Sequence, residues 1–139
     1  MSVEKRLARM ETAEDVRRLV AAYATACDAY DVDAVSRLLH PDIVLLVGDR
    51  SWRGRDEVAR FFRQAWAGTV APQRHFITNL AIDDLQPDGA EATSYFLHTT
   101  TPGECPLIGW GSYRDTFARH DGALFFVHKE ITMEFQATR

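Results

Sequence analysis

Cysteine is scarce in this sequence, with two residues among 139. Cys27 falls inside an expected helix and Cys105 in a segment rich in Pro and Gly, and the two do not pair at metal-ligand or redox-motif spacing. A chain of this length with 46% apolar residues can bury a core without disulfides or a structural metal. We therefore expect no metal site, and a location in the reducing cytoplasm.

Positive charge is also limited, because 16 Lys and Arg face 20 Asp and Glu and the formal net charge is −4. No cluster of basic residues is longer than Arg17-Arg18, so the chain lacks the positive surface that nucleic acid or anionic lipid requires. The first ten residues are charged and contain no apolar run, which argues against a signal peptide or a membrane anchor. We expect neither nucleic acid nor a membrane as a partner.

Apolar residues recur at helical spacing in the first part of the chain. The pattern predicts a helix over about residues 12–30, and Thr12 with Asp15 three residues later resembles a capping box at its start. A short second helix is expected over residues 35–39, ended by Pro41. The first part of the chain is therefore predicted to be mainly helical.

The next segments predict a strand and a third helix. Residues 43–47 are apolar and β-branched, and Gly48-Asp49 follows them as a turn, so we expect a hairpin in which a buried strand leads into a brief return through Trp52. Apolar residues then recur with a period of about 3.6 over residues 56–66, with acidic residues at the positive end of the expected helix.

From Arg74 onward the chain reads as strand-like segments separated by turn residues. The expected strands cover residues 74–83, 90–101, 107–119 and 123–136. Their short connections allow only antiparallel neighbours, so these four strands should form a meander. Helices followed by an antiparallel sheet predict an α+β fold with the helices on one face, and no linker or repeat divides residues 1–139.

Polar residues on apolar faces mark the candidate site. His75 shares a face with apolar residues on the first meander strand, and His98 does so on the second. Asp28 lies beside the apolar stripe of the long helix, with no Lys or Arg three or four residues away. Small residues surround it, which indicates close packing there, so its carboxylate needs an interior donor. A histidine on the facing sheet would serve, although each of these residues also fits a purely structural role.

The remaining charged and histidine residues are given less weight. Lys129 interrupts the apolar face of the last strand, where it either reaches water or answers a charge. Of the two we expect the first, with its stem packed on the sheet edge and the ammonium group in water. His128 falls on the opposite face and is assigned no role. His40 and His120 lie beside a proline and in a turn, where we expect them to be solvated.

Five segments carry a family resemblance through their order and spacing. They are Tyr23-x4-Asp28, His40-Pro-Asp-Ile-Val, Trp52-Arg-Gly-Arg-Asp-Glu-Val, Arg74-His-Phe-Ile-Thr-Asn and Gly111-Ser-Tyr-Arg-Asp-Thr-Phe-Ala-Arg-His-Asp-Gly. With them the chain resembles the SnoaL-like branch of the nuclear transport factor 2-like superfamily over nearly its whole length. The resemblance implies a cone, in which a strongly curved sheet wraps around a long N-terminal helix and leaves an open mouth and a deep apolar pocket.

The resemblance also implies site residues. It places Asp28 and His75 on the acid/base dyad shared by scytalone dehydratase, bile acid 7α-dehydratase and hexachlorocyclohexane dehydrochlorinase, families that carry out eliminations without a cofactor. Tyr23 falls on a pocket tyrosine of the bile acid enzyme and on a lysine of the dehydrochlorinase. His98 falls on an acidic residue of the bile acid enzyme and lies close to a second pocket histidine of scytalone dehydratase. Lys129 falls on an arginine of the dehydrochlorinase. Because these flanking groups differ between families, the dyad carries over but no substrate does.

The expected function is therefore a cofactor-independent dehydratase, isomerase or cyclase, a group that includes polyketide cyclases. Neutral His75 would act as general base while Asp28 orients its ring, and Tyr23 or His98 would donate to a leaving hydroxyl or to an enolate oxygen. The expected substrate is a small apolar cyclic or aromatic molecule. Its expected contacts are Val44, Phe61, Phe62, Trp66, Phe96, Trp110, Tyr113 and Lys129.

Two other classes stay open, because one fold can host many functions. The chain could be a small-molecule-binding member of the same fold, in which Asp28 and His75 only satisfy each other. It could also be the small subunit of a ring-hydroxylating dioxygenase, with the open sheet face docked on a larger chain. Whichever class applies, the enzyme included, we expect a homodimer or homotrimer, with Trp110 and the neighbouring strand segments as a candidate homodimer interface.

Overall fold

The longest helix of the computed structural model, which describes residues 1–101 and 107–138, begins well before the predicted start. This helix, α1, covers Val3–Asp28. Ser2 caps it, because the Ser2 hydroxyl oxygen accepts a hydrogen bond of 3.1 Å from the backbone N–H of Lys5. No Gly or Pro lies between this cap and the predicted start to break the helix.

The Thr12 and Asp15 pair ties the middle of α1 to the sheet. Thr12 is fully buried, and its hydroxyl donates 2.9 Å to the carbonyl oxygen of Pro87. Arg119 donates from Nη2 to both the Thr12 hydroxyl, at 2.9 Å, and the Asp15 carboxylate, at 3.1 Å. The predicted capping role is wrong, because both residues lie inside α1 and their side chains contact distant parts of the chain.

The second helix, α2, covers Val32–Ser36 and so lies three residues earlier than predicted. Leu39 already begins strand β1 (Leu39–Val47), where it pairs with Phe126. Pro41 therefore does not end a helix but lies inside a strand. The register there is irregular, which is where a strand tolerates a residue without an N–H.

The next two elements agree with the sequence pattern. Strand β1 turns at Gly48, which has a φ of 62°, into the short strand β2 (Arg50–Arg53). Helix α3 (Arg55–Trp66) follows and buries its apolar face against α2, β1 and β2. The predicted hairpin and third helix are confirmed.

Four long strands form the predicted antiparallel meander. They are β3 (Gln73–Gln86), β4 (Gly89–Thr100), β5 (Leu107–His120) and β6 (Ala123–Thr138). The sheet order is β2-β1-β6-β5-β4-β3, so β1 pairs parallel to β6, a neighbour that the sequence pattern did not predict. Register shifts in the β3–β4 and β5–β6 pairs increase the local bend of the strands.

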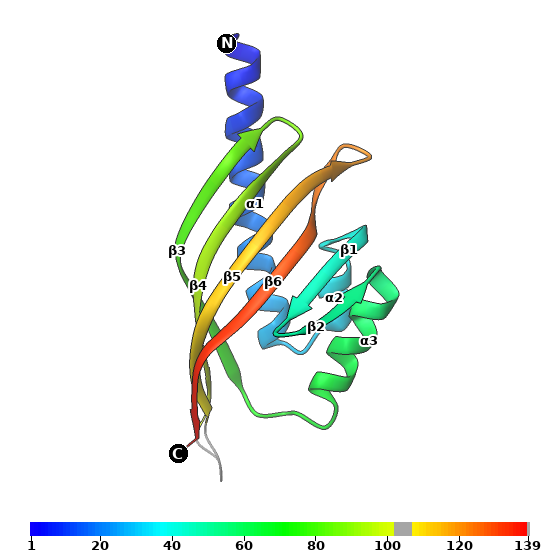
Figure 1. Cartoon of the computed structure of the whole chain (residues 1–139), viewed down its shortest axis with the longest axis vertical. Coiled ribbons are helices and arrows are strands. Elements are labelled where there is room, and N and C mark those ends of the chain that lie inside the picture. The colour runs from blue at the N-terminus through cyan, green and yellow to red at the C-terminus, as the bar shows by residue number, and fades with distance from the viewer. Residues whose placement is uncertain (102–106, 139) are drawn as a thin grey trace.

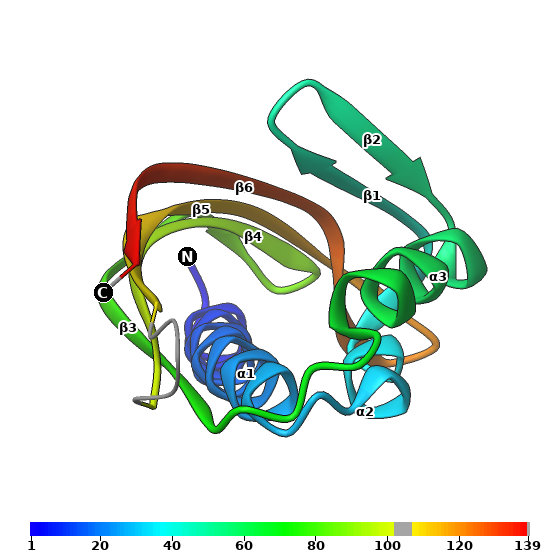
Figure 2. The same cartoon turned by 90° about the horizontal axis from the view of Figure 1, so that it is seen from below.

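The curved sheet encloses the long helix. Figure 1 shows α1 running behind the meander, and Figure 2, seen along the cone, shows β3 to β6 bending around α1 while α2 and α3 lie beside β1. The predicted α+β cone is confirmed. Among the described residues, the helices are too short or too polar to cross a membrane.

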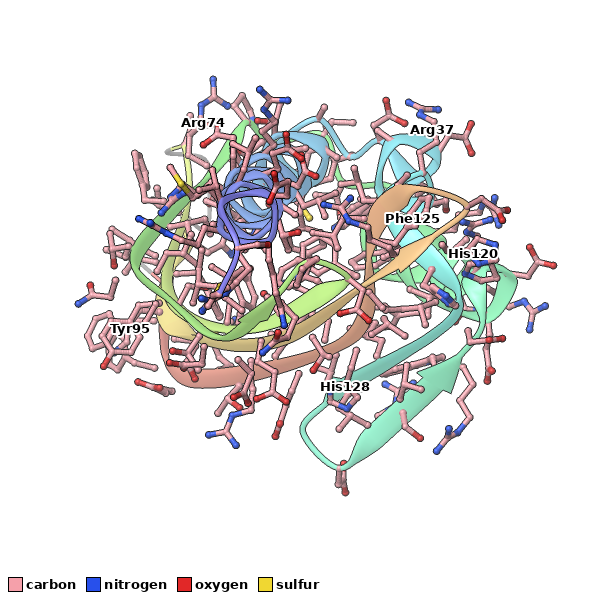
Figure 3. The ribbon with its side chains drawn as sticks, turned by 90° about the horizontal axis from the view of Figure 1, so that it is seen from above. Arg37, Arg74, Tyr95, His120, Phe125 and His128 are labelled. Atoms are coloured by element: carbon pink, nitrogen blue, oxygen red, sulfur yellow. The ribbon has the colours of Figure 1, made fainter. Side chains whose placement is uncertain are left out.

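The outer face of the sheet is turned away from α1. Figure 3 shows Tyr95 of β4 and His128 of β6 pointing to this side. One line of directly paired residues on this face is apolar and 36% to 50% exposed across all four meander strands. We call it the outer row, and its residues are Phe76, Leu97, Trp110 and Phe135.

Candidate active site

The carboxylate at the end of α1 contacts the first meander strand. Asp28 Oδ1 accepts two hydrogen bonds from His75, one of 2.9 Å from the backbone N–H and one of 2.7 Å from ring Nδ1. The side chains of Asp28 and His75 are 15% and 13% exposed, so the pair lies at the margin of the interior. The predicted contact is present. It uses Nδ1, so the second ring nitrogen of His75, Nε2, takes no part in it.

Gln73 fixes the same end of the helix. Residues two apart in a strand share a face, so Gln73 and His75 both point toward the last turn of α1. Gln73 Nε2 donates 2.6 Å to the backbone carbonyl oxygen of Cys27, which also accepts a hydrogen bond of 3.0 Å from the backbone N–H of Tyr30 at the end of the helix. The two strand residues therefore hold two consecutive helix residues.

His98 joins this group from the next strand. It pairs directly with His75 in the β3–β4 register, and the two rings stack with centroids 4.4 Å apart. Its Nε2 lies 2.7 Å from Gln73 Oε1. Burial, together with the charge of the neighbouring His75, lowers the pKa of His98 from 6.5 to about 4, with a partly opposing effect of Asp28. The sequence predicted Asp28, His75 and His98 but missed Gln73, whose place on the same strand face was the available signal.

Lys129 lies deeper in the cone and is only 2% exposed. Its Nζ donates 3.1 Å to Asp115 Oδ1 and sits 4.1 Å and 3.8 Å from the ring centroids of Tyr23 and Tyr113. The expectation that its ammonium reaches water is wrong, because a counter-charge lies directly opposite it on β5. We call Tyr23, Tyr113, Asp115 and Lys129 the interior cluster.

Asp115 was missed in the sequence although a signal existed. It alternates with Tyr113 and Phe117 on β5, so an inward carboxylate facing Lys129 could have been inferred once the hairpin register was known. Burial raises the pKa of Asp115, and Lys129 partly offsets this. Burial also raises the pKa of Tyr23 and Tyr113 well above 10 and that of Cys27 to about 12.

Most of the predicted aromatic contacts surround the interior cluster rather than the dyad. Phe62 packs against Tyr23, and Phe96 stacks on Tyr113 with centroids 4.5 Å apart. Phe61 and Trp66 are half-buried on α3 and both contact Phe62. The ring of Tyr23 contacts the rings of Phe62, Tyr113 and Phe126, and not those of His75 or His98.

Two predicted contacts lie elsewhere. Val44 pairs with His128, whereas its neighbour Leu45 pairs with Lys129, so Val44 is on the outer side of the sheet. Trp110 is 45% exposed and stacks on Phe135 in the outer row. A strand pattern without a known register does not tell the two faces apart, and β5 has a register shift just after Trp110.

A cavity of about 240 Å³ lies between the start of β3 and the end of β4, and its lining includes Gln73 but not Asp28, His75 or His98. Gln73 lines it together with the residues that follow His98, and the lining consists of Pro72, Gln73, Arg74, Thr99, Thr100 and Thr101. This volume approaches that of ordinary ligand pockets. Among the described residues, no three His, Cys, Asp or Glu side chains are grouped to hold a metal ion, and Cys105 lies outside these residues.

Comparison with known families gives a match to the SnoaL-like domain over residues 8–130. The chain belongs to the SnoaL-like domain family. This family is part of the nuclear transport factor 2-like superfamily, in agreement with the resemblance in the sequence. A comparison with curated proteins found no match.

Solved structures share the SnoaL-like fold. A candidate scytalone dehydratase from Novosphingobium aromaticivorans is 21% identical, with a TM-score of 0.81, and 98% of this chain covers 91% of that one. The hexachlorocyclohexane dehydrochlorinase LinA-type3 from Novosphingobium barchaimii is 15% identical, with a TM-score of 0.84 and coverage of 96% and 94%. A Mycobacterium tuberculosis protein of unknown function is 20% identical, with a TM-score of 0.77 and coverage of 88% and 71%. At these identities the likeness shows the fold.

Proposed function

We propose that this SnoaL-like protein is a cofactor-independent acid/base enzyme, a dehydratase, isomerase or cyclase, that removes a proton from carbon. The observation that supports this most is the hydrogen bond of 2.7 Å between Asp28 and His75 Nδ1 at the margin of the interior. Structural relatives named as a dehydrochlorinase and a candidate dehydratase support the same class of reaction.

His75 would act as the general base. Because Nδ1 donates to Asp28, the proton must be taken by Nε2 of the neutral ring. Asp28 fixes this tautomer and stabilises the imidazolium that forms, which is the role of an orienting carboxylate. Positioned proton transfer of this kind contributes about 10²- to 10⁴-fold in rate.

The proton would come from a carbon next to a carbonyl or an activated ring position. The electron pair of the broken C–H bond moves into the carbonyl to form an enolate. Return of the proton at another carbon gives isomerisation, and attack of the enolate on an internal electrophile gives ring closure. Elimination follows if a β-substituent leaves with the electrons of its own bond to carbon. The aromatic side chains of the interior support an apolar cyclic or aromatic substrate, since Phe62 packs on Tyr23 and Phe96 stacks on Tyr113.

The first test measures proton abstraction without requiring the natural substrate. The α-protons of 1-indanone and 2-tetralone are followed by NMR in D₂O with wild-type protein and with the Asp28→Asn and His75→Gln variants. We expect exchange to fall by about 10²-fold or more in each variant, because each removes one half of the dyad. His120→Gln is the matched control, since His120 is an exposed histidine away from the dyad.

Two outcomes would contradict the proposal. Exchange that survives both dyad variants would exclude His75 as the base. Ketones that bind the wild-type protein but keep their protons after long incubation would instead favour the small-molecule-binding class, in which Asp28 and His75 only satisfy each other.

A further inference from the structure

Gln73 is buried beside the dyad, and both ends of its side-chain amide are in use. It is only 5% exposed. Its Nε2 lies 2.6 Å from the carbonyl oxygen of Cys27, and its Oε1 lies 2.7 Å from His98 Nε2. Rotation of this buried amide by 180° would lose the hydrogen bond to Cys27, because it would place the amide oxygen against the carbonyl oxygen.

These contacts determine which nitrogen of His98 carries the proton. The Cys27 carbonyl can only accept, so the amide end that faces it must be the NH₂ group. The end that faces His98 is therefore the oxygen, which also can only accept, so His98 Nε2 must donate. A neutral imidazole has a single N–H, and Nδ1 of His98 is consequently a hydrogen-bond acceptor.

The acceptor of His98 is available to a ligand. Its ring is partly exposed, and within residues 1–101 and 107–138 no hydrogen bond occupies Nδ1. The low pKa of His98, whose largest cause is burial, keeps the ring neutral near pH 7. At that pH the residue accepts a hydrogen bond rather than donating one to a leaving group.

We propose that Gln73 is a positioning residue that holds His98 in its Nε2–H form, and that the substrate presents a hydroxyl group to His98 Nδ1 beside the carbon that His75 deprotonates. The stacking of the two rings at 4.4 Å allows one small molecule to contact both. This inference rests on the proposed function and narrows it to hydroxylated cyclic or aromatic compounds. An ether or a halogenated analogue lacks the donor and leaves Nδ1 without a partner.

Two variants of Gln73 separate its effect on His98 from its effect on the helix end. Gln73→Met keeps the length of the side chain but removes both hydrogen bonds. Gln73→Glu keeps an oxygen for His98 Nε2 but replaces the donor to the Cys27 carbonyl with a second acceptor oxygen, so that hydrogen bond is lost. A merely structural role for Gln73 would make both variants behave alike.

The decisive measurement is the tautomer of His98, read from long-range ¹H–¹⁵N correlations at pH 7. We expect a protonated Nε2 in the wild-type protein and in Gln73→Glu, and a mixture of tautomers in Gln73→Met. We also expect a higher His98 pKa in Gln73→Glu than in the wild-type protein, because a carboxylate stabilises the imidazolium. A proton on Nδ1 in the wild-type protein, or an unchanged tautomer in Gln73→Met, would overturn the inference.

Binding of 4-ethylphenol and of its methyl ether, 4-ethylanisole, tests the hydroxyl group. The phenol should bind about tenfold more tightly to the wild-type protein and shift the His98 signals, and this preference should shrink in Gln73→Met. Equal affinity, or a phenol that leaves the His98 signals unmoved, would overturn the substrate class. Neither measurement needs turnover, so a failure here is distinct from a failure of the proton-exchange test above.

Discussion

At the scale of single residues, the site depends on which hydrogen bonds each ring nitrogen makes. His75 and His98 are adjacent and stacked, yet one donates from Nδ1 to a carboxylate and the other from Nε2 to an amide oxygen. A carboxylate stabilises an imidazolium far better than a neutral amide does. The two histidines therefore lie in different electrostatic surroundings, although the sequence presents them in similar strand positions.

The titration of His98 leads to a prediction about stability. The pKa of His98 is about 4 in the folded protein, against 6.5 for a solvated histidine, so the unfolded chain binds its proton first on acidification. His98 thus contributes stability that is present above pH 6.5 and is lost as the pH falls toward 4. Urea unfolding between about pH 7 and pH 4 should show a shallower loss in His98→Gln than in the wild-type protein, and parallel curves would contradict the assignment.

The sequence predicted these residues only in part. Asp28 and His75 could be found because each breaks an apolar pattern and neither has a local partner. Gln73 and Asp115 share strand faces with predicted site residues but were missed, because their roles depend on which residue faces them across the strands, and that register is set by tertiary packing. The tautomer of His98 likewise follows from contacts and not from any pattern in the chain.

At the scale of elements, the hairpin of β5 and β6 holds a buried ion pair in register. Asp115 and Lys129 lie directly opposite each other, and the lysine and aspartate side chains are 3% and 1% exposed. Removing one partner leaves a buried charge without compensation, whereas replacing both with apolar residues leaves none.

This pair can be tested with a double-mutant cycle. Lys129→Met and Asp115→Leu should each lower the free energy of unfolding by about 3–5 kcal/mol, while the double variant should lie much closer to the wild-type protein. Chemical denaturation of the four proteins measures the cycle. Additive losses in the double variant would show that the two charges do not stabilise each other.

The same hairpin depends on one glycine. A Cβ at Gly111 would lie 2.0 Å from the backbone oxygen of Thr132 and 2.8 Å from the Phe96 ring, so there is no room for a side chain. Gly111→Ala should cost several kcal/mol, since the strands must separate where the register shifts. Thermal unfolding should show the loss, with Ser112→Ala as the neighbouring control; a wild-type melting temperature for Gly111→Ala would exclude this close packing.

The elements themselves were mostly predictable, and the errors share a cause. The hairpin of β1 and β2, helix α3 and the four-stranded meander follow from local periodicity and turn residues. The start of α1 and the end of α2 were misplaced because Thr12 and Leu39 serve contacts with distant segments. A pattern within a short stretch of sequence carries no information about such distant contacts.

At the scale of the whole molecule, the outer row departs from an ordinary polar surface. Its four side chains cross the meander and stay 36% to 50% exposed, and Tyr95 and Met133 add further exposed apolar area. Contiguous apolar patches of this kind mark interaction sites on soluble proteins.

We expect a second copy of the chain to cover the outer row, since a two-fold axis through one self-complementary patch closes the assembly. Trp110→Ser should shift the wild-type dimer toward monomer in light scattering coupled to gel filtration, while His75→Gln should leave the mass unchanged. A wild-type protein that is monomeric at high concentration would refute this, and co-purification with a larger oxygenase chain would instead favour a subunit role.

The parallel pairing of β1 with β6 has a consequence for how the chain reaches its native state. Leu39 can pair with Phe126 only after the intervening segments have been made, so the hairpin of β1 and β2 emerges from the ribosome long before its partner strand. Pairings between such distant segments slow folding, because a long loop must close before any contact forms. We therefore expect the docking of this hairpin onto β6 to be the last step of refolding, well after α1 and β3 have formed their contacts.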